Sequence, residues 1–119
     1  MSIVSDLVSR PGVIAAGEYS YRGDRFTFKG NLTEEWARMA SIMCRATLMG
    51  ASMQGRMVAR VAGEGVGLSP VRGWLVTGPS YTLCIVANVF CMLDNGNASK
   101  NGIMAELMER LADAPVDLV

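Results

Sequence analysis

The 119-residue sequence contains no histidine. Histidine is the commonest general base near neutral pH and a frequent metal ligand, and it usually activates serine and cysteine nucleophiles. Asp24 and Glu18 lie near the first predicted hairpin, but no other segment brings a paired acid to them. Solvated turn charges explain both residues better than catalysis does. We therefore expect no catalytic residues, no metal ligands, no cofactor and no enzymatic activity.

Cysteine is also scarce, and its spacing excludes a zinc site or a disulfide framework. Cys44, Cys84 and Cys91 form an odd set without a CxxC pair. We expect buried free thiols in a reducing cytoplasm. A predicted turn at Ala87-Asn88 places Cys84 near Cys91, so a redox pair is geometrically conceivable. No lysine, arginine or helix N-terminus is evident beside them to lower a thiol pKa.

Neither charge nor hydropathy favours a nucleic-acid or membrane partner. Eleven basic residues balance eleven acidic ones, and the basic residues are scattered from Arg10 to Arg110. The longest apolar run, from Tyr81 to Leu93, is too short for a membrane helix of about 20 residues. The start, MSIVSDLVSRPG, lacks the basic residues that begin a signal peptide. We expect a soluble, cytoplasmic protein.

The sequence does contain alternating signals for short strands and helices. A first helix with Ile3 and Leu7 on one face ends at Pro11-Gly12, and a last helix carries an apolar stripe that starts at Ile103. The predicted elements between them are strands at 13–21 and 25–30, a long helix between Asn31 and Gly63, and strands at 71–77, 81–86 and 89–93. This order predicts an α+β fold around one antiparallel sheet, with a single domain over residues 1–119 and a mobile tail from 114 to 119.

The long helix has two candidate N-caps and two internal glycines. Asn31 with Glu34 forms a variant capping box, and Thr33 is a competing cap. Gly50 and Gly55 each cost about 1 kcal/mol relative to alanine inside a helix, so we expect a packing reason or a bend at these positions.

Apolar residues follow two lines along this helix. The first line is Met39, Met43, Ala46, Gly50, Met53 and Met57. The second line is Trp36, Ala40, Thr47, Ala51, Val58 and Val61. One line is enough to bury a helix against a sheet, so two lines indicate a second partner. The methionines indicate core plus a homodimer interface ahead of a tolerant peptide-binding groove.

We predict a homodimer built on the long helix and the strand that follows it. The predicted interface residues are Met43, Ala46, Gly50, Met53, Met57 and Trp74. Small side chains at the helix centre allow two backbones to approach closely. The strand at 71–77 is expected at the sheet edge, where it can pair with its copy. Trp36 and Trp74 are expected to be core or interface aromatics, since no basic track surrounds them.

The loop GEGVGLSP, at residues 63–70, is glycine-rich but does not predict a phosphate site. A Walker loop follows a strand, precedes a helix and ends in a Lys-Ser/Thr pair. Here a helix precedes the loop, a strand follows it, and the lysine is missing. An ordinary connection is favoured.

Three stretches carry a family resemblance: PGVIAAGEYSYRGDRFTFKGNL, EEWARMASIMCRA and VRGWLVTGPSYTLCIVANVF. In this order they resemble the DUF2173 family of small prokaryotic proteins, within the roadblock/LC7 domains of the profilin-like folds. The resemblance covers nearly the whole chain. It implies a five-stranded antiparallel sheet with the long helix on one face and the terminal helices on the other. It also implies homodimerisation, and it supplies no catalytic residues.

The resemblance leaves three classes of function open. The first is a non-catalytic interaction or scaffold module whose partner is a small Ras-like GTPase or a multi-subunit complex. The second is an accessory protein of a heterodisulfide-reductase-like sulfur-oxidation system, for which the cysteines would be tested first. The third is a small-ligand sensor that binds its ligand beside the sheet.

Overall fold

The computed structural model describes residues 2–20, 25–63 and 71–114. The elements are α1 (Ile3–Val8), β1 (Val13–Tyr19), β2 (Phe26–Gly30), α2 (Glu34–Ala62), β3 (Gly73–Thr77), β4 (Tyr81–Val86), β5 (Val89–Asp94) and α3 (Lys100–Arg110). This is the order that the sequence predicts. The predicted turn at 22–24, most of the glycine-rich loop and the end of the tail lie outside the described residues.

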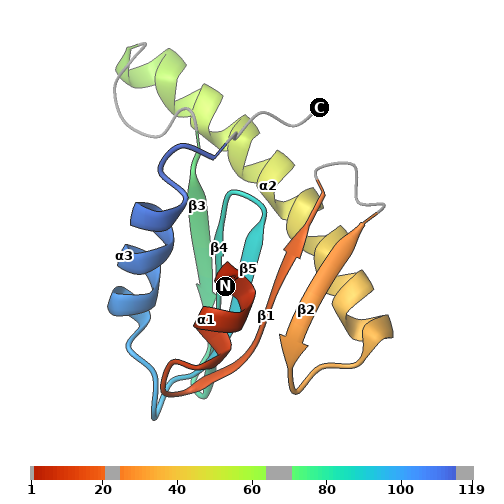
Figure 1. Cartoon of the computed structure of the whole chain (residues 1–119). Coiled ribbons are helices and arrows are strands. Elements are labelled where there is room, and N and C mark those ends of the chain that lie inside the picture. Colours follow the sequence, from red (N-terminus) through yellow and green to blue (C-terminus); the bar gives the residue numbers. More distant parts are fainter. Residues whose placement is uncertain (1, 21–24, 64–70, 115–119) are drawn as a thin grey trace.

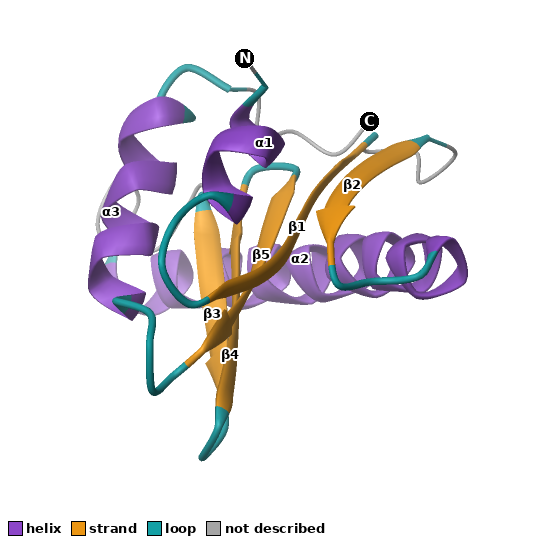
Figure 2. Ribbon diagram, turned by 60° about the horizontal axis from the view of Figure 1, so that its bottom comes forward, coloured by secondary structure: helices purple, strands orange, loops and turns teal. Residues whose placement is uncertain are grey.

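The five strands form one antiparallel sheet in the order β2-β1-β5-β4-β3. α2 connects β2 at one edge to β3 at the other edge, and it crosses one face of the sheet diagonally (Figure 1). α1 and α3 lie side by side on the opposite face, as Figure 2 shows. The two-sided arrangement of helices and the edge position of the strand after the long helix confirm the predictions.

A separate cluster of buried side chains fills each face of the sheet. On the side of α1 and α3, the cluster contains Leu7, Leu93, Leu107 and the two thiols of Cys84 and Cys91. On the side of α2, it contains Tyr19, Cys44, Ile85 and Phe90.

Gly17 of β1 makes room for an aromatic ring on the next strand. Gly17 is the cross-strand partner of Phe90 on β5. A Cβ atom at position 17 would overlap the ring of Phe90. The missing side chain therefore lets Phe90 lie flat across β1 in the α2-side core.

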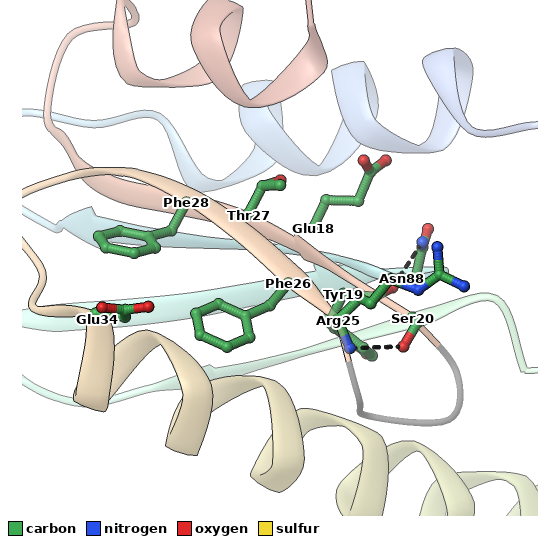
Figure 3. A pocket seen from close by; sticks show the side chains of 9 residues that line it. All are labelled: Glu18, Tyr19, Ser20, Arg25, Phe26, Thr27, Phe28, Glu34 and Asn88. Atoms are coloured by element: carbon green, nitrogen blue, oxygen red, sulfur yellow. Dashed lines mark hydrogen bonds between the residues drawn. The ribbon is translucent and has the colours of Figure 1, made fainter.

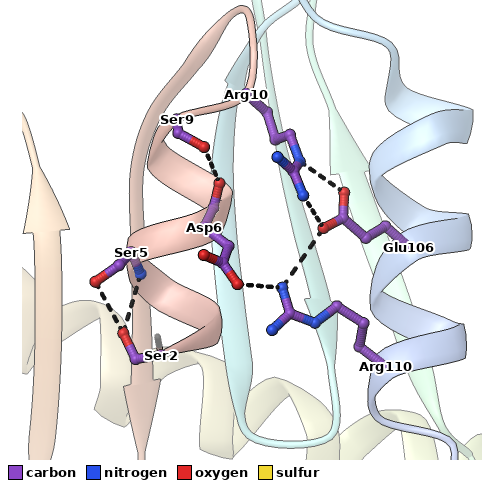
Figure 4. A network of polar contacts seen from close by, with 7 residues as sticks. All are labelled: Ser2, Ser5, Asp6, Ser9, Arg10, Glu106 and Arg110. Carbon is purple, nitrogen blue, oxygen red and sulfur yellow. Dashed lines mark hydrogen bonds and ion pairs between the residues drawn. The ribbon is translucent and has the colours of Figure 1, made fainter.

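Charged side chains join α1 to α3 at the surface (Figure 4). The Arg10 guanidinium donates two hydrogen bonds to the Glu106 carboxylate, at 3.1 and 3.0 Å. Arg110 contacts Asp6 at 2.9 Å and Glu106 at 3.6 Å. These pairs are partly exposed, so burial of Leu7 and Leu107 beneath them contributes more to the docking of the two helices.

The structure selects one of the two candidate N-caps of α2, and the predicted strand boundaries differ from the observed ones by up to two residues. Thr33, and not Asn31, is the N-cap of α2, because its hydroxyl accepts a hydrogen bond from the backbone N–H of Trp36 at 3.2 Å. β3 begins at Gly73, two residues later than expected. Val71 is nevertheless buried, which explains why the apolar pattern includes it.

Candidate interaction surface

α2 turns a line of mostly small residues toward the sheet. The buried residues of the helix are Ala37, Ser41, Cys44, Leu48 and Gly55. Spacings of three, four and seven place them on one side of a helix. The Ser41 hydroxyl donates to the carbonyl oxygen of Ala37 at 2.8 Å, so its burial leaves no unpaired hydroxyl. Small side chains along this line let the helix lie close to the strands.

The first predicted apolar line of α2 faces solvent instead of the sheet. All of its members are exposed: Met39, Met43, Ala46, Gly50, Met53 and Met57. The second line is divided, since Ala40, Ala51 and Val58 are half-buried while Trp36, Thr47 and Val61 are exposed. The expectation that the methionines form core is wrong, because the sheet contacts a third line of smaller residues.

Gly50 lies at the middle of the exposed side of α2. Apart from its chain neighbours and the backbone of the adjacent helical turns, no atom of the described residues lies within 4 Å of the position that a Cβ would take there. Gly55, in contrast, is on the buried line. The expected packing reason for Gly50 is therefore not found within the described part of the chain, and the backbone at this point is open to close approach from outside.

The exposed apolar area continues onto β3, which packs beside α2. Val76 is 56% exposed, and period two places it on the same face of the strand as Trp74. Figure 2 shows that the β3–β4 hairpin extends past α2, and Val76 belongs to the end of β3 that leads into this hairpin. Val76 is not among the predicted interface residues, although its alternation with Trp74 is visible in the sequence. We use the name α2–β3 surface for Met43, Ala46, Gly50, Met53, Met57 and Val76.

Trp74 lies at the margin of this surface. Its ring packs half-buried against the α2-side cluster. Its indole Nε1 is buried, and no acceptor among the described residues receives its hydrogen bond. An unpaired buried donor lowers the free energy of unfolding by about 1–3 kcal/mol, so the Trp74 indole destabilises the described part of the chain.

The three thiols are free and buried. Cys84 and Cys91 are direct cross-strand partners on β4 and β5, as the predicted turn between them requires. Burial raises the pKa of Cys91 to about 12 and also raises the pKa of Cys84. Burial raises the pKa of Cys44, on the other side of the sheet, to about 12 as well. Neutral thiols at these positions pack as small apolar side chains.

An open hollow of about 730 Å³ lies along the edge strand β2 (Figure 3). Glu18 and Glu34 both line it, but Figure 3 shows them on opposite sides of β2. The Asn88 side chain donates to the carbonyl oxygen of Tyr19 at 2.8 Å, which holds the hairpin rather than a ligand. Asp24 lies outside the described residues. No pair of acids converges among the residues that line the hollow.

Within 2–20, 25–63 and 71–114, no group of three or more histidine, cysteine or acidic residues is placed to hold a metal ion. Within the same ranges, no helix has the length and apolar character needed to cross a membrane.

Comparisons with known proteins agree with this arrangement. The family profile described as "Uncharacterized conserved protein (DUF2173)" matches residues 3–109. The crystal structure of a Roadblock/LC7 domain from Streptomyces avermitilis is similar, with a TM-score of 0.59, 21% sequence identity, and 92% of each chain covered. The search of curated proteins gave no match. At this identity the likeness shows the fold alone, and it confirms the expected roadblock/LC7-like fold. The chain belongs to the DUF2173 family.

Proposed function

We propose that the protein is a non-catalytic interaction module that forms a homodimer through the α2–β3 surface. The main evidence for this proposal is that large apolar side chains are exposed on one side of α2. Met53 and Met57 are 63% and 61% exposed, and Met39 and Met43 lie on the same side. Soluble monomers rarely expose contiguous apolar patches of this kind unless the patch binds something.

The edge strand supports a two-fold arrangement. Among the described strands, β3 has β4 on one side and no strand on the other, and an edge strand of this kind can pair with another chain. Antiparallel pairing of β3 with its copy would continue the sheet across a two-fold axis, the commonest symmetry of homo-oligomers.

The proposed module has no catalytic activity, because the thiols are buried and the acidic side chains beside β2 do not converge. The thiols are buried with raised pKa values. The acids that line the hollow beside β2 lie on opposite sides of that strand. The kind of partner that the fold suggests for such a dimer is a small Ras-like GTPase or a multi-subunit complex.

A redox accessory role is the second candidate function. The cross-strand position of Cys84 and Cys91 favours it, since paired residues on neighbouring antiparallel strands lie within reach of a disulfide. Their complete burial counts against it.

Substitution of Gly50 tests the dimer. Gly50→Arg places a charge in the proposed contact, where loss of its hydration costs several kcal/mol. In the separate chain the arginine meets open space, and its better helix propensity adds about 0.5–1 kcal/mol. The variant is therefore expected to be a folded monomer. Light scattering measures its mass, and circular dichroism measures its helix content.

Gly50→Ala is the matched control, because it gives the same gain in helix propensity without a charge. It is expected to remain a dimer. A Gly50→Arg variant that stays dimeric at low micromolar concentration would remove α2 from the interface.

A further inference from the structure

β2 forms the edge of the sheet that is opposite to β3. Among the described strands, β1 pairs with one side of β2 and no strand pairs with the other side. Figure 2 shows β2 at the outer margin of the sheet, with the first turns of α2 beneath it. The proposed homodimer uses the β3 edge, so the β2 edge is available for a different contact.

A hydrogen bond at the start of β2 indicates which of its backbone groups point outward. The Ser20 N–H donates to the carbonyl oxygen of Arg25 at 2.9 Å. Bonded and unbonded pairs alternate along antiparallel strands, so Thr27 is the next residue of β2 that bonds back to β1. Phe26 and Phe28 therefore direct their backbone N–H and C=O groups away from β1, toward the open edge.

The other end of the strand pair agrees with this alternation. The Asn31 N–H donates to the carbonyl oxygen of Ile14 at 2.9 Å. Asn31 follows Arg25 by an even number of positions, so both belong to the set of residues that bonds to β1. The outward groups of Phe26 and Phe28 are two residues apart, or about 7 Å, which is the spacing at which a neighbouring extended backbone offers donors and acceptors.

The side chains of Phe26 and Phe28 form an apolar wall of the hollow beside this edge (Figure 3). Their rings stack with centroids 6.3 Å apart, and both side chains are half-buried. They lie on the α2 side of β2, whereas Thr27 points to the other side. A second hollow, of about 390 Å³, shares Phe26 with the first and is lined by the start of α2. An extended chain beside β2 would place every second side chain against these rings.

The charged residues around the two hollows have both signs. Glu18, Glu34 and Arg25 line the larger hollow, and Glu35 and Arg38 line the smaller one. Charge therefore does not select a class of ligand at this edge. The features that can select one are the outward backbone groups and the two rings.

We infer that the β2 edge binds an extended segment of a partner protein, which adds to the sheet as a further strand and carries apolar side chains at alternate positions. Main-chain hydrogen bonds to Phe26 and Phe28 would hold the segment, and its apolar side chains would contact their rings. The inference deepens the proposed function and rests on it for one point, the choice of a partner protein over a second copy.

A second copy of β2 is the less suitable occupant of this edge. Because the proposed homodimer already uses the β3 edge, pairing between β2 edges would join dimer to dimer without closure. Lys29 is exposed on β2, and a charged side chain on an edge strand is a common guard against pairing between identical strands. A segment from a different protein completes each edge without forming a polymer.

Synthetic peptides test the inference on the full chain. The probe is a labelled peptide of about seven residues, long enough to span β2, in which valine alternates with threonine. A permuted peptide has the same composition with its valines together at one end. Two further peptides carry backbone N-methyl groups, either at every valine or at every threonine. Fluorescence anisotropy measures the affinities, and NMR of the isotope-labelled protein locates the binding.

The alternating peptide is expected to bind at least about tenfold more tightly than the permuted peptide. A strand offers N–H donors to one neighbour from one alternate set of residues, so one N-methylated peptide is expected to lose about tenfold or more and the other less than about threefold. Binding is expected to slow the amide exchange of Phe26 and Phe28 by at least about tenfold, whereas the Thr27 amide, which already bonds to β1, changes less.

Phe28→Ala tests the apolar contact, and Thr27→Ala is the matched control on the other face of the same strand. Phe28→Ala is expected to weaken binding by about fivefold or more, and Thr27→Ala by less than about twofold. Circular dichroism checks that both variants fold, and the N-methylated peptides test the pairing on the unmodified chain. Light scattering is expected to show that Phe28→Ala keeps the mass of the unmodified protein, so failure of this inference is distinguishable from failure of the homodimer.

Four results would overturn the inference. The first is no binding of the alternating peptide at about 1 mM. The second is an equal effect of the two sets of N-methyl groups, which would show that the peptide does not pair as a strand. The third is protection of β3 amides instead of β2 amides. The fourth is a mass above that of a dimer that falls when the peptide is added, which would assign the β2 edge to a second copy.

Discussion

The cross-strand thiols give a quantitative prediction about reactivity. Cys91 has a pKa raised by burial to about 12, whereas an unfolded cysteine has a pKa near 8.5. Only the thiolate attacks a disulfide reagent. At pH 8 the folded chain would therefore present about a thousandfold less Cys91 thiolate than the unfolded chain.

Burial also limits the access of the reagent to both thiols. Cys84 and Cys91 have no exposed surface, so a reagent reaches them only when the hairpin of β4 and β5 opens. For a domain with an unfolding free energy of about 5 kcal/mol or more, the fully unfolded fraction is below about one in a thousand. We expect labelling of the native protein by an aromatic disulfide reagent at pH 8 to be at least about a thousandfold slower than in urea.

The assay follows the absorbance of the released thiolate over time, and single cysteine-to-serine variants assign each phase. The three thiols are expected to be separately dispensable for folding. Native labelling of Cys84 or Cys91 within seconds would refute the reasoning from burial. A disulfide that forms between them on exposure to oxidised glutathione, and is reversed by reduced glutathione, would favour the redox accessory role.

Two other predictions concern stability. Arg10 holds the pKa of Glu106 below its usual value, mainly by hydrogen bonding. The contribution of this pair to the free energy of unfolding is therefore present above about pH 4.5, and it is lost as the pH falls through the lowered pKa of the folded state. Urea unfolding of Glu106→Gln should show a loss of less than about 1 kcal/mol at pH 7. The loss should become smaller as the pH falls below about 4.5, and a loss that stays constant in acid would contradict this. Leu48→Ala should lower the free energy of unfolding by about 2–5 kcal/mol, because Leu48 is buried. Val61→Ala, at a position that is 87% exposed, should change it by no more than about 0.5 kcal/mol. Similar changes in both variants would contradict the assignment of the buried side of α2.

The order and pairing of the elements could be predicted from the sequence because local signals agree with the fold. Phe26 and Phe28 alternate with polar residues on β2, and the Ala87-Asn88 turn sets the register of β4 and β5. Ala87 has a positive φ of 52°, as a tight two-residue hairpin turn demands. Turn length and side-chain alternation fix such pairings without reference to distant residues.

The buried side of α2 could not be predicted in the same way. Apolar residues occur around most of the helix, so periodicity offers several candidate faces. The methionine line is the most apolar, yet Ala37 and Ser41 face the sheet because small side chains permit close packing there. Long methionine side chains at those positions would hold the helix away from the strands.

The mass of the unmodified protein in solution tests the central proposal most directly. Light scattering coupled to size-exclusion chromatography, at concentrations down to about 1 μM, is expected to give twice the chain mass of 12.8 kDa. A dimer at this concentration would agree with an α2–β3 surface that is covered by its copy. A mass of one chain at every concentration would contradict the proposal and leave the exposed methionines to a different partner.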